Sequence, residues 1–401
     1  MECYMKKPSY KGTVISCYIG YVSQSIVNNF SPLLFVMFGT SFNISLTQLS
    51  LMIAVNFGVQ LLTDFVAARF VDRVGYRPFV VAAHFLCAAG LSLLSFLPYV
   101  MPPYIGLLIA TVLSAIGGGL IEVIVSPIIE ACPSDNKASA MSLLHSFYCW
   151  GQMAVVLVST LVFRFAGIGA WRVMAVVWAL IPLVNAFLYM RVPINALPAE
   201  DGHSGVFSHF KKKSFVIAFM MMLCAGASEL SMSQWASAFA EEGLGVSKAM
   251  GDLLGPCLFA VFMGIARVFY GKFGGRIALS KFMAGSSALC IAAYLITVAS
   301  PYPLLSLAGC ALCGLAVGIM WPGTFSLASA AMPMGGTSMF AMLAFAGDMG
   351  CTSGPSLTGR IADAFGSDIK AGFAFAVVFP VVMLVLSLVW IKREKNSKNV
   401  R

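Results

Sequence analysis

Long apolar runs alternate with short polar connections along the whole chain, and this alternation predicts twelve membrane-spanning helices. A helix needs about 20 mostly apolar residues to cross the hydrocarbon core of a bilayer, and every run is long enough. The runs cover residues 12–39, 46–71, 78–99, 104–130, 138–164, 170–191, 214–240, 247–271, 277–299, 303–331, 337–362 and 370–391.

One long polar stretch interrupts this pattern, from Pro193 to Lys213, and it divides the runs into two sets of six. We therefore expect an N-terminal six-helix bundle over 1–192, a cytoplasmic linker over 193–213 and a C-terminal bundle over 214–391. A basic cytoplasmic tail would follow over 392–401. The fourth and tenth runs contain GGGLIEVIVSP and CGLAVGIMWPG, and each leads to a proline and a methionine-rich restart. Such repetition is typical of transporters that rock about a central site.

The composition supports an all-α membrane protein. Of 401 residues, 59% are hydrophobic and only 10% are charged, whereas soluble domains have about 25% charged residues. The spans leave no room for a soluble catalytic domain. Cys310 and Cys313 form a C-x-x-C without a second pair, so we interpret them as small packed residues and expect neither a metal nor a cofactor.

The basic residues indicate the orientation. With the N terminus in the cytoplasm, 20 of the 25 Lys and Arg residues fall on the cytoplasmic side, and Arg267 is counted among them. This asymmetry is the positive-inside signal, and it places both termini in the cytoplasm of a cytoplasmic (inner) membrane protein. The net charge of +9 thereby follows from the topology, so no nucleic-acid partner is needed to explain it.

The connection between the second and third runs carries a recognisable motif, ARFVDRVGYRP, with Ala68, Asp72, Arg73, Gly75, Tyr76 and Arg77 at its marked positions. It resembles the signature loop of the major facilitator superfamily, although Ala68 replaces a usual glycine and Tyr76 a usual basic residue. An aspartate at a helix end can pair with a helix terminus or a basic group and hold one face closed. We therefore assign Asp72, Arg73, Gly75 and Arg77 to a gating loop.

Three carboxylic residues stand out within the apolar runs: Glu122, Glu229 and Asp348. Ionisable groups at membrane depth usually mark a pathway, a relay or a partner. Three glycines precede Glu122 and Pro127 follows it, a setting that suits a carboxyl group taking up and releasing a proton, or alternatively a satisfied structural carboxylate. Asp64 and Glu130 lie nearer the cytoplasmic ends and are interpreted as structural ion-pair partners.

Other polar residues complete the candidate site. His145, one run after Glu122, is a second proton-coupling candidate, whereas His84 is interpreted as structural. A sugar site needs hydrogen-bonding groups and an aromatic face, and the runs expected to line a cavity supply both. The substrate-binding candidates are Asn28, Asn29, Asn56, Gln60, Trp150, Gln152, Glu229, Gln234, Trp235, Trp321 and Asp348. Each could instead pack an interface.

Within the superfamily, the chain resembles the fucose permease and glucose/galactose transporter branch. GGGLIEVIVSP matches its glycine-rich fourth span and implies proton coupling at Glu122. VNNFSPLL is similar to its asparagine-rich first span and implies substrate contact by Asn28 and Asn29. The first span here lacks the acidic residue of a fucose permease. The resemblance implies sugar–proton symport by alternating access.

Alternatives to symport remain at this point. A proton-coupled drug or metabolite efflux antiporter is the nearest, although the fifth run lacks the G-x-x-x-G-P spacing of drug antiporters, which occurs instead at 350–355. A non-transporting membrane sensor is a second class. No paired nucleophile and base is apparent, so no enzyme is expected. We expect a monomer that binds a small-molecule substrate in the lipid bilayer, coupled to protons or to Na⁺.

Overall fold

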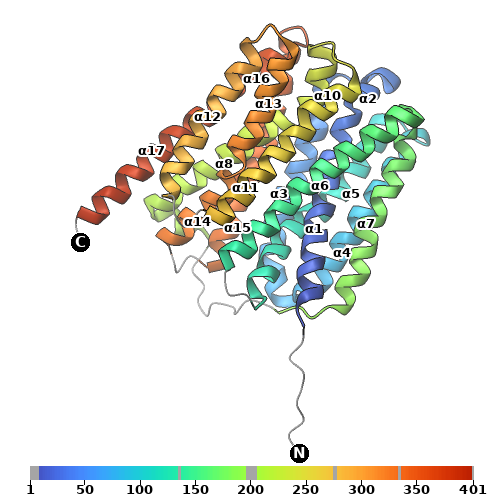
Figure 1. Ribbon diagram of the computed structural model, residues 1–401. Coiled ribbons are helices and arrows are strands. Elements are labelled where there is room, and N and C mark those ends of the chain that lie inside the picture. The colour runs from blue at the N-terminus through green and yellow to red at the C-terminus, as the bar shows by residue number, and fades with distance from the viewer. Residues whose placement is uncertain (1–8, 134–136, 196–205, 274–277, 333–335, 400–401) are drawn as a thin grey trace, which may run out of the picture.

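The computed structural model describes residues 9–133, 137–195, 206–273, 278–332 and 336–399 (Figure 1). The described chain is helical throughout and forms a bundle of long helices that run roughly side by side. The helices of the first half are α1 (Lys11–Asn29), α2 (Phe35–Phe42), α3 (Leu46–Val74), α4 (Tyr76–Leu94), α5 (Pro103–Ala131), α6 (Lys137–Ala166) and α7 (Trp171–Arg191), with 3-10 turns η1 (Ser31–Leu34), η2 (Leu97–Tyr99) and η3 (Ile168–Ala170).

The second half begins after a 3-10 turn, η4 (Val206–Lys211), and several of its crossings are broken into shorter helices. They are α8 (Lys213–Ser233), α9 (Ala236–Ala238), η5 (Phe239–Gly243), α10 (Lys248–Asp252), η6 (Leu253–Cys257), α11 (Leu258–Phe273), α12 (Leu279–Ala299), α13 (Pro303–Val317), α14 (Met320–Ala331), α15 (Gly336–Ala364), α16 (Ile369–Ala376) and α17 (Val378–Asn399). Both η5 and η6 are π-helical turns, and Pro256 lies inside η6.

These elements account for the twelve crossings predicted from the sequence. Within the described residues, ten stretches are long and apolar enough to span a membrane. The other two predicted crossings correspond to α1, continued by η1 and α2, and to α15. Both bury many polar residues, which in α1 are Thr13, Ser16, Ser23, Gln24, Ser25, Asn28 and Asn29. These two crossings thus bring polar side chains into the bundle, in α15 those of Asp348, Ser356 and Thr358.

Local sequence explains several helix boundaries. Asn43 ends α2 with φ of +55°, and Ser45 begins α3 with a capping box. Ser45 Oγ accepts from the Gln48 amide at 3.2 Å, and Gln48 Oε1 accepts from the Ser45 amide at 2.9 Å. Gly75 joins α3 to α4 with φ of +93°, a conformation that glycine adopts without steric penalty.

Contacts divide the helices into two groups joined along two seams. In the first half, α4 packs closely on α5 and α7, and α3 packs on α5; in the second, α8 packs on α15, and α12 on α13 and α17. The main seams between the halves are α3 against α15 and α6 against α11. Figure 1 shows both chain ends toward one side of the bundle, here called the terminal side; the other is the far side.

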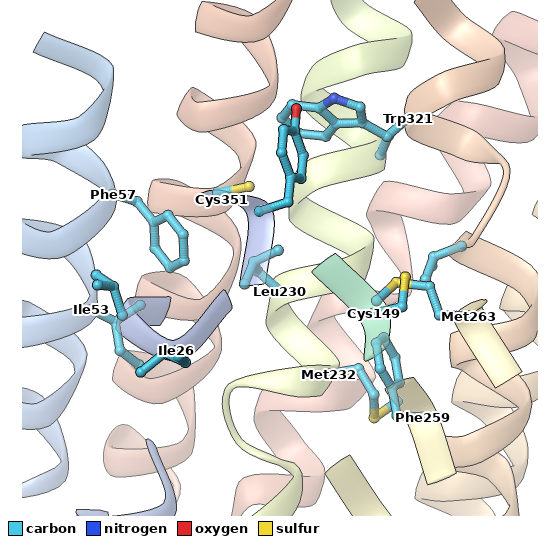
Figure 2. Packing of buried hydrophobic residues seen from close by; sticks show 14 of the residues in the cluster. Ile26, Ile53, Phe57, Cys149, Leu230, Met232, Phe259, Met263, Trp321 and Cys351 are labelled. Carbon is cyan, nitrogen blue, oxygen red and sulfur yellow. The ribbon is translucent and has the colours of Figure 1, made fainter. Parts of the chain in front are cut away.

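A continuous apolar core spans the two halves. Figure 2 shows part of it, with side chains from helices of both halves packed around the middle of the bundle. The labelled members are Ile26, Ile53, Phe57, Cys149, Leu230, Met232, Phe259, Met263, Trp321 and Cys351, all buried. Because both halves contribute, separating them on either side exposes apolar surface that must then face water or a solute.

Polar contacts tie the halves together on the far side. Lys248 Nζ donates to the carbonyl of Leu33 at 2.7 Å and lies 3.3 Å from the carboxylate of Asp252. Asp252 also accepts from Thr160 Oγ1 of the first half at 3.1 Å and from Ser237 of its own half. Charge-assisted hydrogen bonds of this kind are stronger than neutral ones, so this group, here called the far-side latch, favours closure there.

Candidate functional site

Four side-chain amides from three helices meet near the middle of the bundle. Asn28 Oδ1 accepts from Asn56 Nδ2 at 3.1 Å and from Gln60 Nε2 at 2.9 Å. Gln234 of the second half donates from Nε2 to the backbone carbonyl of Asn28 at 3.2 Å. All four residues are buried, at 8% exposure or less. We call them the amide cluster; they are four of the predicted substrate-binding residues, brought together from three crossings.

A cavity adjoins the amide cluster on its far side. Its wall includes Asn28, Asn56 and Gln234, and further polar groups come from Ser31 and Ser114. The rest of the lining is mostly apolar: Val27, Pro32, Phe35, Met52, Ile53, Leu91, Leu94 and Ala110, with Thr111. A few polar groups thus converge in a mostly apolar wall next to the amide cluster.

Asn29 points to the other side of α1 and joins a tyrosine. Its Nδ2 donates to the Ser25 carbonyl at 2.9 Å and to the Tyr148 hydroxyl at 3.3 Å. Tyr148 lies on α6, three residues after His145 and therefore on the same helical face. Tyr148 also interacts with the side chain of Asn28, so both asparagines of the first crossing contact α6, and Asn28 belongs to the amide cluster as well.

Glu122 lies near the terminal-side half of α5 and is bonded to Gln24 of α1, whose Nε2 donates to Glu122 Oε2. Gln24 is 2% exposed, and its Oε1 has no hydrogen-bond partner among the described residues. The preceding glycines allow a close approach: a Cβ on Gly119 would lie 2.9 Å from the Gln60 carbonyl oxygen. Gly118 and Gly119 therefore allow α3 to pack closely against α5, whereas Gly117 lies against α4.

His145 joins a hydrogen-bonded group on the same face of α1, one turn before Gln24. The Tyr21 hydroxyl lies 2.8 Å from Ser126 Oγ and 3.5 Å from His145 Nε2, and the two rings meet edge to face. Ser126 is one helical turn after Glu122 on α5, so both face α1. The two predicted proton-coupling residues therefore contact neighbouring side chains of one helix, Gln24 and Tyr21.

His84 makes a separate contact away from this group. Its Nδ1 lies 2.7 Å from the Val80 carbonyl and its Nε2 lies 2.8 Å from Asn185 Nδ2. A carbonyl can only accept and an amide nitrogen only donates, so the ring is neutral with its proton on Nδ1. Both nitrogens are used in packing, as expected for a structural histidine.

Arg267 corrects the sequence interpretation. It was counted as a cytoplasmic loop residue, but it lies inside α11 and is only 4% exposed. Its Nη2 is 3.5 Å from Glu229 Oε2; its Nη1 donates to the His145 carbonyl at 3.0 Å, and its Nε to the Gly318 carbonyl at 3.1 Å. Gly318 lies at the break between α13 and α14, so one guanidinium connects four helices.

Asp348 meets a residue for which another role was expected. It lies on α15, and its carboxyl group is close enough to that of Asp64 on α3 for a direct hydrogen bond. Each residue is 2% exposed. Asp64 was interpreted as an ion-pair partner; that interpretation is wrong for the described part of the chain, where no salt bridge to Asp64 occurs. The side chain of Glu130 lies outside the described residues.

The tryptophans and Gln152 occupy different environments. Trp235 is fully buried, and its indole N–H donates to the Pro355 carbonyl at 2.9 Å. Trp321 is 9% exposed and covers Gly347, while Trp150 is partly exposed and its ring edge lies against Gly264. Gln152 is buried. Trp235 therefore has no free donor, whereas Trp150 is only partly buried.

The predicted gating loop is described in part. Gly75 makes the reversal, and Arg77 donates to the carbonyls of Tyr189, Met190 and Val192 at 2.6–3.2 Å. A cation at the last carbonyls of α7 is a favourable helix cap. Arg77 thus ties α4 to α7 within the first half. The side chains of Asp72 and Arg73 lie outside the described residues.

The family follows from comparison with known proteins. The model of the Major Facilitator Superfamily matches residues 17–347 and 257–400, which together cover nearly the whole chain. The chain belongs to the Major Facilitator Superfamily. It is accordingly a multi-pass membrane transporter, and the twelve-helix major facilitator fold predicted from the sequence is confirmed. No curated protein sequence matches this chain.

Several solved structures share this superfamily fold at low sequence identity. The E. coli fucose:proton symporter FucP aligns with a TM-score of 0.70 and 17% identity, over 95% of this chain and 99% of that one. A D-xylose-proton symporter aligns with a TM-score of 0.77 and 15% identity, over 95% and 97%. A bacterial homologue of the human lysosomal transporter Spinster, in an inward-facing and occupied conformation, aligns with a TM-score of 0.76 and 15% identity, over 96% of this chain and 98% of that one. At such identities the likeness concerns the fold.

The sequence did not identify several residues that bond to the predicted site residues directly or through Tyr21, namely Tyr21, Gln24, Ser126, Tyr148 and Arg267. Two signals were available. Gln24 precedes Asn28 by four residues and so shares its helical face. Arg267 falls inside the predicted run 247–271, which placed it in the membrane despite its count as a loop residue.

Proposed function

We propose that this transporter carries a neutral monosaccharide-like solute together with a proton by alternating access. The observation that carries the proposal is Glu122, a carboxyl group within a membrane-spanning helix that accepts a hydrogen bond from a neutral amide, Gln24. A charged carboxylate at membrane depth is costly without a cation, whereas its protonated form is tolerated. Glu122 therefore takes up a proton with the solute and releases it on the other side.

The solute is held by the amide cluster and by nearby groups that are still able to bond. Amides donate and accept, which suits the hydroxyl groups of a sugar. Gln24 Oε1 supplies an unused acceptor next to Glu122, so a sugar hydroxyl bonded there would sense the protonation of the carboxyl group. Trp150, partly exposed, provides an aromatic face for the apolar side of a sugar ring.

His145 and Tyr21 extend this group toward the second half. Tyr21 links Ser126 to His145, and the backbone of His145 is bonded to Arg267. Protonation at Glu122 can thereby influence the α6–α11 seam through side chains in direct contact. The proposed orientation has both termini in the cytoplasm, and it is supported by the basic residues of the terminal side, whose excess persists without Arg267.

The test is uptake of labelled monosaccharides, including fucose, glucose and galactose, into proteoliposomes with and without an inward proton gradient. Wild type should accumulate one of them above equilibrium only with the gradient. Glu122→Gln should lose accumulation but keep exchange of the same sugar across the membrane. His84→Gln, outside the site, serves as the matched control and should still accumulate sugar. Absence of sugar uptake under every gradient would refute the proposal, and proton-driven export of larger apolar compounds would favour the efflux alternative.

A further inference from the structure

The seam between α3 and α15 is antiparallel and continuous. At the far side, Thr47 at the start of α3 donates to Asp363 near the end of α15. Toward the terminal side, the rings of Phe65 and Phe345 lie 6.3 Å apart. Because α3 belongs to the first half and α15 to the second, any rocking of the halves must alter this seam.

Asp64 and Asp348 face each other across this seam, between those two contacts. Each is 2% exposed, and each carboxyl group is within hydrogen-bonding reach of the other. Neither oxygen of Asp64, nor Oδ2 of Asp348, has a donor among the described residues. Two carboxylates cannot bond each other when both are ionised, but they form a hydrogen bond when one proton lies between them.

The surroundings supply no compensating cation in the described part of the chain. From α5, Glu122 acts on both aspartates, and from α15 itself the Cys351 thiol lies next to Asp348. The buried guanidinium of Arg267 is engaged by Glu229 instead. The groups facing the pair are thus acidic or neutral. No cation among the described residues would offset the repulsion between Asp64 and Asp348 if both were ionised.

We propose that Asp64 and Asp348 form a second proton site, in which one shared proton holds α3 to α15 and its loss pushes the two halves apart on the terminal side. The proton comes from water on that side and returns to it, and no covalent bond changes. The inference deepens the proposed function, since it rests on proton coupling, but it needs no sugar. Glu122 would then link the proton to the solute, and the aspartate pair would link a proton to the movement of the halves.

The test measures the separation of the halves without substrate. Spin labels are placed on cysteines introduced at Val74 and Ala331, exposed residues at the terminal-side ends of α3 and α14, in a Cys3→Ser background. The ten described native cysteines are buried, which favours selective labelling. Pulsed dipolar EPR in lipid nanodiscs then gives the distance distribution at a series of pH values.

Wild type should shift to longer distances as the pH rises, because deprotonation leaves two like charges in contact. A one-proton linkage changes the ratio of open to closed populations by up to about tenfold per pH unit. Asp64→Asn and Asp348→Asn each keep a hydrogen-bonding pair that cannot become doubly charged, so their ratios should stay within about twofold over the same range. Asp368→Asn, an exposed aspartate at the start of α16 and outside the α3–α15 seam, is the control and should keep the wild-type response.

Glu122→Gln separates this inference from the proposed function. If the aspartate pair is the site that responds to pH, Glu122→Gln should keep the pH response even though it loses sugar accumulation. The inference would be overturned if Glu122→Gln lost the pH response while both aspartate variants kept it. It would also be overturned if the distances in wild type did not change with pH. Each variant is first checked for a monodisperse gel-filtration profile; should one aspartate variant fail to fold, the other decides the question by itself.

Discussion

The buried guanidinium of Arg267 offers a direct test of how the centre is held together. In Arg267→Met the long apolar stem is kept, but the carboxylate of Glu229 loses its partner at 3.5 Å, and the carbonyls of His145 and Gly318 lose their donors. The side chains of the pair are only 5% and 9% exposed, so solvent cannot replace the bonds. Removing one partner of a buried ion pair typically destabilises a protein by about 3–5 kcal/mol.

Thermal unfolding in detergent, followed by fluorescence-detected gel filtration, measures this loss. One kcal/mol shifts the melting temperature by about 2–4 °C in chains of 150–250 residues and by less in longer ones, so a fall of about 5 °C is expected. Arg267→Lys keeps the charge but not three directed bonds, and it should lie between wild type and Arg267→Met. Lys272→Met, at the exposed end of the same helix, should change the melting temperature little.

The double variant Arg267→Met/Glu229→Gln decides whether the ion pair is the cause. With the carboxylate neutralised, the uncompensated charge disappears, and part of the stability should return, a coupling of about 1–3 kcal/mol. The reasoning about the pair is wrong if Arg267→Met has the melting temperature of wild type. It is also wrong if the double variant loses more stability than the two single variants lose together.

Three further predictions concern packing and the far-side latch. Lys248→Met removes a charge-assisted hydrogen bond worth about 1.5 kcal/mol, so a cysteine placed at Ser31 should react with a polar maleimide about tenfold faster; an unchanged rate would contradict the latch. Gly119→Val puts a side chain where a Cβ already lies 2.9 Å from a carbonyl oxygen of α3, and folded yield should collapse on gel filtration, whereas Gly285→Val, with open space around it, should fold. His84→Gln should lower stability by about 1–3 kcal/mol in thermal unfolding and leave proton-driven transport intact; loss of transport in a folded protein would show that the histidine is more than structural.

Periodicity and composition were sufficient to predict the fold. The described crossings begin and end within a few residues of an apolar run, with two exceptions: the run 12–39 comprises α1, η1 and α2, and α17 continues beyond the run 370–391 to Asn399. The local signals of helix ends, such as the capping box at Ser45 and the reversal at Gly75, are short-range and readable. The division into halves at 193–213 stays a prediction.

The site was harder to predict from the sequence, because its contacts join residues far apart in the chain. Asn28, Asn56, Gln60 and Gln234 were named individually, yet only the fold shows that they share bonds. The partner of Asp348 lies 284 residues away in sequence, and nothing local marks it.

Burial can also reverse the meaning of a residue type. Trp235 has the character of a ligand-stacking aromatic, but the structure uses its N–H to bond the Pro355 carbonyl inside the second half. Arg267 has the character of a loop cation, but the acidic side chain of Glu229 on a neighbouring helix allows it to be buried. In both cases the neighbour that decides the role comes from another crossing.

The central claim, proton-coupled movement of a sugar through Glu122, is tested most directly by the proton itself. Proteoliposomes are loaded with a pH-sensitive dye, and the accepted sugar is added outside without any proton gradient. The account predicts that the lumen acidifies as sugar enters in wild type, and that Glu122→Gln exchanges sugar with no change of luminal pH. Sugar entry without acidification in wild type, or equal acidification in Glu122→Gln, would contradict it.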